Sequence, residues 1–222
     1  MIKFEHTAVY GWEAAIRGMR NPLNSWERSD TELGYGDKGA DVIIGDNDHS
    51  LMMRLAKGGP VHAKYRRMIT ATVDITAPLY WWKEFDTYKV GTVANSCSTM
   101  HKITSKPIEL SDFSIDNFYL GDDIELDLKD MFINAVSDCE SLRRKYLETN
   151  DKRYWTGLIQ LLPTSYNQKR TIQLNYEVLV GMYWDRRNHK LDEWHTFCDW
   201  IRDLPYSEII IGADNEQSEA DI

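Results

Sequence analysis

The chain has 222 residues, of which 42% are hydrophobic and 27% are charged, a composition typical of a folded globular domain. Its formal net charge of −9 argues against nucleic-acid binding, and no apolar run approaches the roughly 20 residues that a membrane-spanning helix needs. The N-terminus lacks the basic-then-apolar pattern of a signal peptide, and the three cysteines (Cys97, Cys139 and Cys198) are widely spaced. We therefore expect a cytoplasmic protein with reduced thiols, no disulfide framework and no structural metal.

Short strands and helices are predicted to alternate in the N-terminal half. Apolar and polar residues alternate over 69–76, which is typical of a strand with one buried face. Pro78 is well placed to begin a helix that contains Trp81, Trp82 and Phe85. The elements predicted here are, in order, a strand over 1–9, a helix over 10–20, a helix over 46–57, the strand over 69–76 and the helix after Pro78.

The C-terminal half is predicted to be mainly helical, after an irregular loop over 91–120 that is rich in Ser, Asn, Asp and Gly. Apolar residues recur at spacings of three and four over 127–149, which predicts an amphipathic helix. These residues are Leu128, Met131, Ala135, Cys139, Leu142 and Tyr146. Further helices are predicted over 151–162, 174–187 and 190–203, followed by an acidic, flexible tail over 213–222. Together these elements predict one α+β domain over 1–212, with a small antiparallel sheet packed against about six helices.

Polar residues end an apolar stripe on the helix predicted over 174–187. Offsets of four, seven and eleven residues return to nearly the same face of a helix. One face is therefore expected to carry Asn175, Leu179, Met182 and Arg186. A buried arginine needs an anionic partner, since an unpaired buried charge costs several kcal/mol. Arg186 is therefore a candidate ligand-binding residue; the alternative is that the last helical turn is exposed and Arg186 pairs locally.

Other candidate residues have structural alternatives. His62 follows a Gly-Gly-Pro turn and is either a hydrogen-bonded loop histidine or a ligand or base. The segment 92–99 is dense in small hydroxyl and amide groups, so it either caps a helix or holds a phosphate or a base edge. Trp81 and Trp82 are expected in the core, although one of them could stack on a planar ligand.

The common motifs of metal and nucleotide sites are missing from the sequence. His189, His195 and Cys198 lie near Glu193 but do not have the spacing of a standard metal site. There is no GxSxG elbow to support a Ser–His–Asp triad, and there is no GxGxxG or GxxxxGK phosphate loop. We therefore expect no metal.

Four segments together resemble the flavin-dependent thymidylate synthase (ThyX) family. The strongest is LIQLLPTSYNQKRTIQLNYEVLVGMYWDR at 158–186, which is similar to that family's helix ending in Leu-Pro, short strand and Asn-led helix ending in Arg. Upstream, GGPVHAKY resembles the family's SPFEH element, and DITAP is followed by an aromatic helix. VANSCSTMH resembles the second half of the RHRxxSxNExSxRY signature. The resemblance covers about residues 46–203.

The resemblance implies a homotetramer of α+β subunits that binds FAD and dUMP between subunits. In that family reduced flavin, with NADPH as reductant, drives transfer of a methylene group from methylenetetrahydrofolate to dUMP without a protein nucleophile. Arg186 matches the arginine that stabilises the ionised uracil ring, which is electrostatic stabilisation of developing charge. The residues implied on the nucleotide side are Glu84, Thr87, Ser96, Ser98 and Arg186. Those implied on the flavin side are His62, Lys64, Tyr88, Lys89, Asn95 and Asn175.

The chain departs from the family pattern at several cationic positions. TYK at 87–89 stands in place of RHR, and Ser96, Met100 and His101 replace Glu, Arg and Tyr of the signature. At three further positions the family has polar residues. Two of these are arginines in the family and are Ile159 and Glu177 here; the third is Gly181 here. Part of the lost charge could come from Lys64, Arg66, Arg67 and Lys89. Three hypotheses follow: a divergent thymidylate synthase, a non-catalytic module of the same fold that binds a nucleotide or a protein, and an unrelated α+β hydrolase or scaffold.

Overall fold

A computed structural model describes residues 2–34, 42–116 and 128–212 of the chain. The fold is α+β, as predicted, with a four-stranded antiparallel sheet in the order β1-β4-β6-β5 and a two-stranded sheet formed by β2 and β3. The strands are β1 (Lys3–Tyr10), β2 (Glu32–Leu33), β3 (Val42–Ile43), β4 (Thr70–Pro78), β5 (Thr92–Ser96) and β6 (Asn167–Asn175). The helices are α1 (Trp12–Arg20), α2 (Asp46–Lys57), α3 (Leu79–Phe85), α4 (Thr99–Lys102), α5 (Leu128–Thr149), α6 (Lys152–Leu161), α7 (Tyr176–Arg186), α8 (Asp192–Arg202) and α9 (Glu208–Ile211).

The chain divides into two compact units. The first comprises 1–3, 75–87 and 95–170, and the second comprises 4–74, 88–94 and 171–222. All four strands of the larger sheet contribute residues to both units. That the two units form one domain over 1–212 stays a prediction, and the tail predicted over 213–222 lies outside the described residues.

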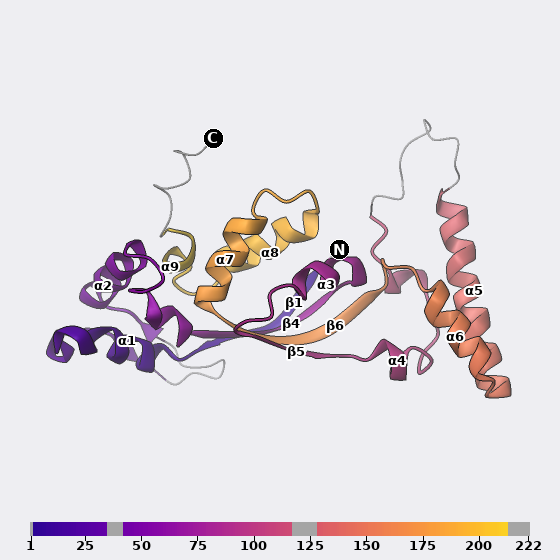
Figure 1. The fold of residues 1–222 in the computed structure, drawn as a ribbon, viewed down its shortest axis with the longest axis horizontal. Coiled ribbons are helices and arrows are strands. Elements are labelled where there is room, and N and C mark those ends of the chain that lie inside the picture. The colour runs from indigo at the N-terminus through magenta and orange to yellow at the C-terminus, as the bar shows by residue number, and fades with distance from the viewer. Residues whose placement is uncertain (1, 35–41, 117–127, 213–222) are drawn as a thin grey trace. The chain divides into compact units, whose positions relative to one another are not determined.

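In the first unit, α5 and α6 lie side by side (Figure 1). Their apolar faces and residues from 103–113 bury one cluster, which consists of Ile103, Ile108, Phe113, Phe132, Val136, Cys139 and Leu158. The bounds of α5 confirm the helix predicted over 127–149, and Cys139 and Leu142 of the predicted stripe lie in or against the cluster, but the N-terminal part of the buried face is shifted by one residue. Phe132 and Val136 are buried, whereas the predicted Met131 is 61% exposed.

One position on the buried face of α5 is occupied by an arginine, which the search for apolar periodicity did not identify. Arg143 lies on the buried face of α5, where its guanidinium contacts both carboxylate oxygens of Glu140 at 2.7 and 2.9 Å and the Thr104 carbonyl at 3.1 Å. Because these contacts compensate the burial of its charge, a charged residue occupies a core-facing position that an apolar pattern does not include.

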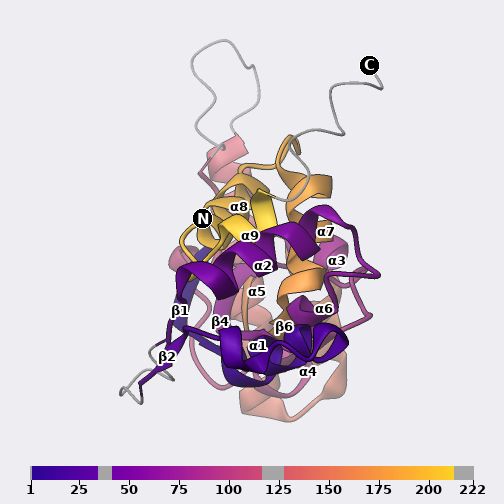
Figure 2. The ribbon, with the colours of Figure 1, turned by 90° about the vertical axis from the view of Figure 1, so that its left-hand side faces the viewer.

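In the second unit, α7 has neighbours among the other helices of that unit. It contacts α8 and α9, and α9 also contacts α2 (Figure 2). The interior here is strongly aromatic: Trp12, Tyr176, Trp194 and Phe197 are all fully buried, and the Tyr176 hydroxyl donates to the Pro205 carbonyl at 2.7 Å. In the first unit Trp81 and Trp82 are also fully buried, which confirms their assignment to the core.

The segment predicted as an irregular loop over 91–120 contains regular structure in its described part. It includes β5, α4 and a short 3-10 turn over Leu110–Asp112. β5 is an edge strand whose residues are mostly exposed, so it lacks the apolar alternation by which a strand is recognised in sequence. None of the described helices combines the length and hydropathy needed to cross a bilayer.

Candidate functional site

Arg186, the last residue of α7, is held by the side chain of Tyr88. Its Nε donates to the Tyr88 hydroxyl oxygen at 2.8 Å, and that hydroxyl lies 3.1 Å from Oδ2 of Asp185. Burial raises the pKa of Tyr88, although the neighbouring guanidinium opposes this shift. The hydroxyl therefore stays protonated at neutral pH, so it can accept from Arg186 while it donates to Asp185.

The guanidinium of Arg186 also lies between two aromatic rings. Its central carbon is 4.6 Å from the centre of the buried Trp194 indole and 5.4 Å from the centre of the Tyr88 ring. Such cation–π contacts orient an arginine side chain. Arg186 is half-buried, and its role in ligand binding stays a prediction beside the alternative of local pairing. The arrangement fixes the position of the guanidinium at the C-terminal end of α7.

Asn175 lies at the other end of α7, where it is the N-cap residue. Its side-chain oxygen accepts a hydrogen bond from the Val178 N–H at 3.0 Å. A Cβ atom built on Gly91, whose φ is 74°, would lie 2.8 Å from Cγ2 of Val178 and 3.1 Å from Nδ2 of Asn175. Residues 88–91 therefore contact both ends of α7, and glycine is needed at 91 for both its conformation and this close approach.

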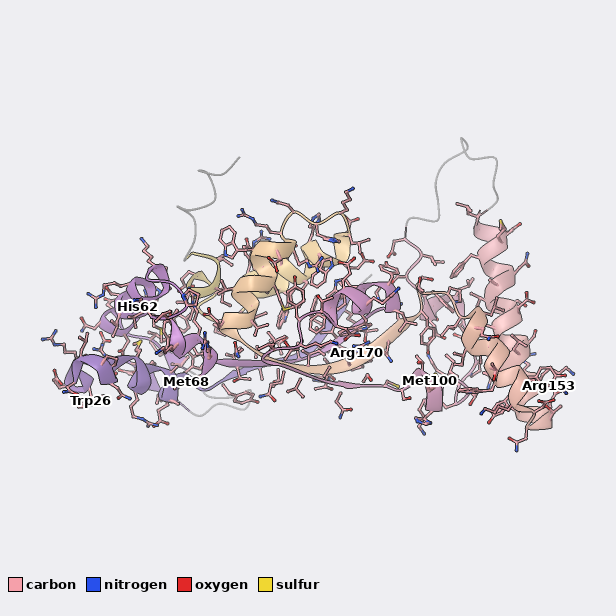
Figure 3. The ribbon with its side chains drawn as sticks, viewed as in Figure 1. Trp26, His62, Met68, Met100, Arg153 and Arg170 are labelled. Carbon is pink, nitrogen blue, oxygen red and sulfur yellow. The ribbon has the colours of Figure 1, made fainter. Side chains whose placement is uncertain are left out.

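His62 and Lys64 lie near each other on the turn that follows α2. The side chains of both residues are exposed, and His62 is labelled in Figure 3. Lys64 begins a 3-10 turn over Lys64–Arg67. Arg66 in the same turn points inward: Nη1 of its buried guanidinium is 3.6 Å from Oε2 of Glu177 on α7. Within the described residues, Nε and Nη2 of Arg66 and Oε2 of Glu177 have no hydrogen-bond partner. Position 177, where the ThyX resemblance expects an arginine, thus holds a carboxylate that pairs with Arg66.

Of the remaining predicted residues, all but Lys89 lie in the first unit, and Ser98 lines a cleft there. The Glu84 carbonyl accepts from both the backbone N–H and the hydroxyl of Thr87, at 3.1 and 2.7 Å, at the end of α3. Asn95 and Ser96 are exposed on β5. Ser98 is the N-cap of α4 and lines a cleft of about 370 Å³. The roles of all these residues in ligand binding stay predictions, as does that of Lys89, which is exposed.

Most residues of this cleft were not found from the sequence. They come from the end of β4, the connection between β5 and α4, the segment after α4 and the start of β6. The lining includes Thr76, Cys97, Ser98, Lys102, Lys106, Asp112, Tyr166, Asn167 and Lys169. No short motif contains these positions, because the cleft forms only when β5 pairs with β6.

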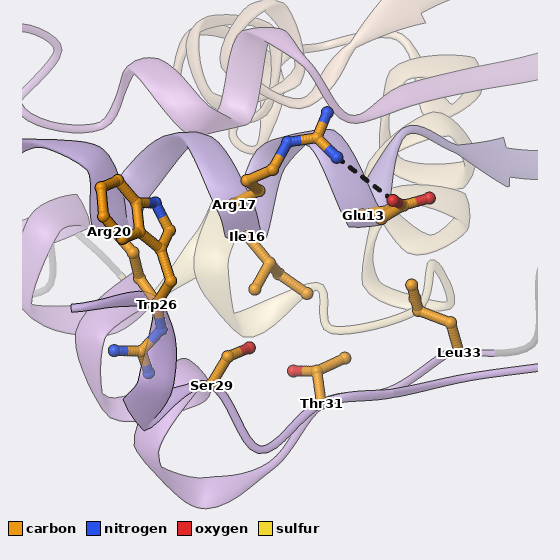
Figure 4. Close-up of a pocket in the computed structure, with 8 residues that line it drawn as sticks. All are labelled: Glu13, Ile16, Arg17, Arg20, Trp26, Ser29, Thr31 and Leu33. Carbon is orange, nitrogen blue, oxygen red and sulfur yellow. Dashed lines mark hydrogen bonds and ion pairs between the residues drawn. The ribbon is translucent and has the colours of Figure 1, made fainter. Parts of the chain in front are cut away.

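A second cavity, of about 210 Å³, contains none of the predicted site residues. It lies between α1 and the segment before β2, and is lined by Glu13, Ile16, Arg17, Arg20, Trp26, Ser29, Thr31 and Leu33 (Figure 4). One of the charged residues that line it, Arg20, is already paired, since its Nε donates to Oδ1 of Asp48 at 2.6 Å. In the described part of the chain, no group of three or more His, Cys, Asp or Glu side chains is positioned to hold a metal ion.

Comparison with known proteins gives similarity in fold only. No family model and no curated protein sequence matches the chain. Two structures of the Helicobacter pylori flavin-dependent thymidylate synthase ThyX, solved with FAD and dUMP, match at TM-scores of 0.60 and 0.64, each with 16% identity. The first match covers 91% of this chain and 95% of the other, and the second covers 96% and 98%. The UMP/dUMP methylase PolB from Streptomyces cacaoi, bound with 5-Br dUMP, matches at a TM-score of 0.57 and 12% identity, over 96% of this chain and 94% of its own. The chain therefore has a ThyX-like fold.

Proposed function

We propose that the chain is a divergent flavin-dependent thymidylate synthase-like protein that methylates dUMP, or a related pyrimidine nucleotide, with FAD and methylenetetrahydrofolate. The single observation that carries this proposal is the fixed guanidinium of Arg186, held by Tyr88 and packed on Trp194. A preorganised cation of this kind stabilises negative charge that develops on a bound ring, at no cost of reorganisation during the reaction. In the proposal the protein is a cytoplasmic homotetramer with NADPH as reductant.

The donors of the second unit fit phosphorylated, anionic ligands. His62, Lys64 and Lys89 are exposed, and the buried Arg66 keeps two guanidinium nitrogens without a partner among the described residues. In this proposal His62, Lys64, Lys89 and the NH2 group of Asn175 contact the flavin, while Arg186 faces the pyrimidine. Reduced flavin, when bound, supplies the reducing equivalents; the side chains named here bind, orient and stabilise charge.

Absorbance spectroscopy tests the proposal directly. The purified chain, alone or after addition of FAD, should show a flavin spectrum that changes when dUMP is added. Arg186→Gln should weaken the dUMP response by at least about tenfold, because it removes a charged hydrogen-bonding group. Arg187→Gln is the matched control, since Arg187 is the next residue and packs on Trp184 at 4.0 Å. A colourless protein that FAD does not reconstitute, or equal responses in the two variants, would contradict the proposal.

A non-catalytic module of the same fold is the second candidate, and one position favours it. Ile159, where the resemblance expects a phosphate-binding arginine, packs against the apolar cluster of the first unit. That position therefore supplies no charge to a nucleotide. This candidate expects ligand binding by calorimetry but no exchange of the uracil C5 hydrogen under reducing conditions, whereas the enzyme exchanges it.

A further inference from the structure

The second unit carries a basic surface in a chain whose formal net charge is −9. From Ser50 to Val73 the sequence contains five lysines and arginines and no aspartate or glutamate. One of the five, Arg66, is buried against Glu177, and the other four are exposed. The basic surface consists of these four residues: Arg54, Lys57, Lys64 and Arg67. No carboxylate in the described ranges of the chain forms an ion pair with any of the four, so their charge attracts an anion.

The four cations belong to two elements that are fixed against each other. Arg54 and Lys57 are three residues apart in the last turn of α2, so they share a face of the helix. The other two begin and end the 3-10 turn over Lys64–Arg67, in which side chains three residues apart also share a face. The buried Tyr65 of that turn donates its hydroxyl to the Met52 carbonyl of α2 at 2.9 Å. The backbone that carries the basic surface is therefore held in place before any anion binds.

The short helix α9 ends beside the same part of α2. Oε1 of Glu208 on α9 is 2.9 Å from Nε2 of His49 on α2, and the two helices are neighbours (Figure 1). A Cβ atom built on Gly212, the last described residue, would lie 3.3 Å from Cε of Met53. Met53 directly precedes Arg54 in α2. The chain therefore leaves its described part next to the basic surface.

The ten residues that follow Gly212 have the complementary charge. They contain four carboxylates and no lysine or arginine; the four are Asp214, Glu216, Glu219 and Asp221. An extended chain spans about 3.3 Å per residue, whereas successive residues of a helix rise by about 1.5 Å, so a few residues are enough to reach the last turn of α2. A short tether also holds the segment at an effective concentration on the order of millimolar, so that weak, salt-sensitive ion pairs suffice for binding.

We propose that the acidic segment 213–222 binds the basic surface of its own chain and competes there with phosphorylated anions. The segment is favoured over an acidic segment of another molecule because it starts beside Met53 and needs no second chain to reach the surface. Lys64 is also among the residues proposed to contact the flavin, so the segment should lower the affinity for FAD. This last consequence rests on the proposed function, whereas the contact itself does not.

Carbodiimide cross-linking of the full-length chain tests the contact, because the reagent joins a carboxylate only to an amine that touches it. At low salt, peptide mass spectrometry should find the carboxylates of 213–222 coupled to Lys57 or Lys64 at least about threefold more often than to Lys190. Lys190 is the internal control, since it is an exposed lysine of the same unit between α7 and α8. High salt should remove the preference. Equal coupling to the three lysines would overturn the proposal.

An equimolar mixture of isotope-labelled and unlabelled chains identifies which molecule supplies the segment. Links within one isotope support the proposal. Links between the two isotopes would place the segment on a second copy and overturn binding within one chain.

Calorimetry with tripolyphosphate tests the competition. At low salt, Glu216→Gln combined with Glu219→Gln should bind this anion at least about threefold more tightly than the parent chain, because half of the competing charge is gone. Adding Lys57→Gln and Lys64→Gln to that variant should remove the gain. A gain that survives the two lysine substitutions would show that the anion binds elsewhere, and would overturn the assignment of the basic surface.

The matched control removes the same charge from the first unit. Asp138→Asn combined with Glu148→Gln changes two exposed carboxylates of α5. Equal tripolyphosphate affinities in this variant and in the variant of segment 213–222 would reduce the effect to net charge and overturn the competition. Neither the cross-linking nor the calorimetry uses flavin or dUMP, so failure of this inference and failure of the proposed function are distinguishable.

Discussion

Asp48 is the most heavily hydrogen-bonded carboxylate described in the second unit. It is fully buried, and besides the Arg20 Nε it accepts from the hydroxyls of Ser29 and Thr31 at 2.8 and 2.7 Å and from the N–H groups of Asp30 and Thr31. Burial by itself would raise the pKa of Asp48, but these donors together lower it below its ordinary value. One side chain thus connects α1, α2 and the segment between them.

Asp48→Asn should therefore destabilise the protein strongly. The substitution leaves Arg20, which is 3% exposed, without a charged partner, and removing one member of a buried ion pair costs about 3–5 kcal/mol. Urea unfolding measures the loss. Glu13→Gln is the control, since its pair with Arg17 is 64% exposed on both sides and is worth about 0–1 kcal/mol. Equal stabilities for the two variants would show that the Asp48 network contributes little.

Candidate site residues were easiest to predict from the sequence where they lie at the ends of a helix with a clear apolar pattern. Arg186 and Asn175 were found because they lie at fixed offsets on one amphipathic helix, and the structure places them at its two ends. The pairing of Arg66 with Glu177 was not predicted. It depends on a contact between segments distant in sequence, the 3-10 turn over Lys64–Arg67 and α7. Sequence spacing contains no information on such contacts.

At the scale of single elements, the helices were predicted well and the exposed strand was not. The bounds of α2 agree with the prediction at both ends, because a Gly-Gly-Pro sequence ends the helix after Lys57. The helix predicted from 174 begins instead at Tyr176, since β6 continues to Asn175. β5 was missed because an edge strand with two exposed faces has no hydrophobic period to detect.

The N-terminus of α7 allows a structural role of Asn175 to be separated from a role in ligand binding. Asn175→Ala should lower the free energy of unfolding by about 1 kcal/mol, because it removes the N-cap bond to Val178. Asn175→Asp keeps an oxygen acceptor at the cap but loses the NH2 donor. If that donor contacts flavin, Asn175→Asp should unfold like the parent chain in urea while FAD binding, measured by fluorescence quenching, weakens. Unchanged FAD binding would leave Asn175 with the structural role alone.

At the scale of the whole molecule, each unit contains a carboxylate whose pKa is lowered by its partners. Asp48 is in the second unit, and Glu140 is in the first. Hydrogen bonds from Arg143, with those from the Ile108 N–H and Arg144, lower the pKa of Glu140 from 4.5 to about 2. A carboxylate with a lowered pKa in the folded state stabilises the protein above its unfolded pKa and loses that contribution as the pH falls.

Low pH should therefore destabilise both units. Glu140→Gln should show how much of the pH-dependent stability comes from Glu140 in the first unit. A shift from 4.5 to about 2 in a side chain that is 13% exposed corresponds to about 3 kcal/mol at pH 7. Urea unfolding at several pH values should show the parent chain more stable than Glu140→Gln by about that amount at pH 7. The difference should shrink as the pH is lowered through 4.5 towards 2, because the parent carboxylate then becomes protonated. Glu148→Gln, in an exposed pair with Lys145, should behave as the parent chain does throughout. A stability difference that does not change with pH would mean that Glu140 acts through packing and not through its charge.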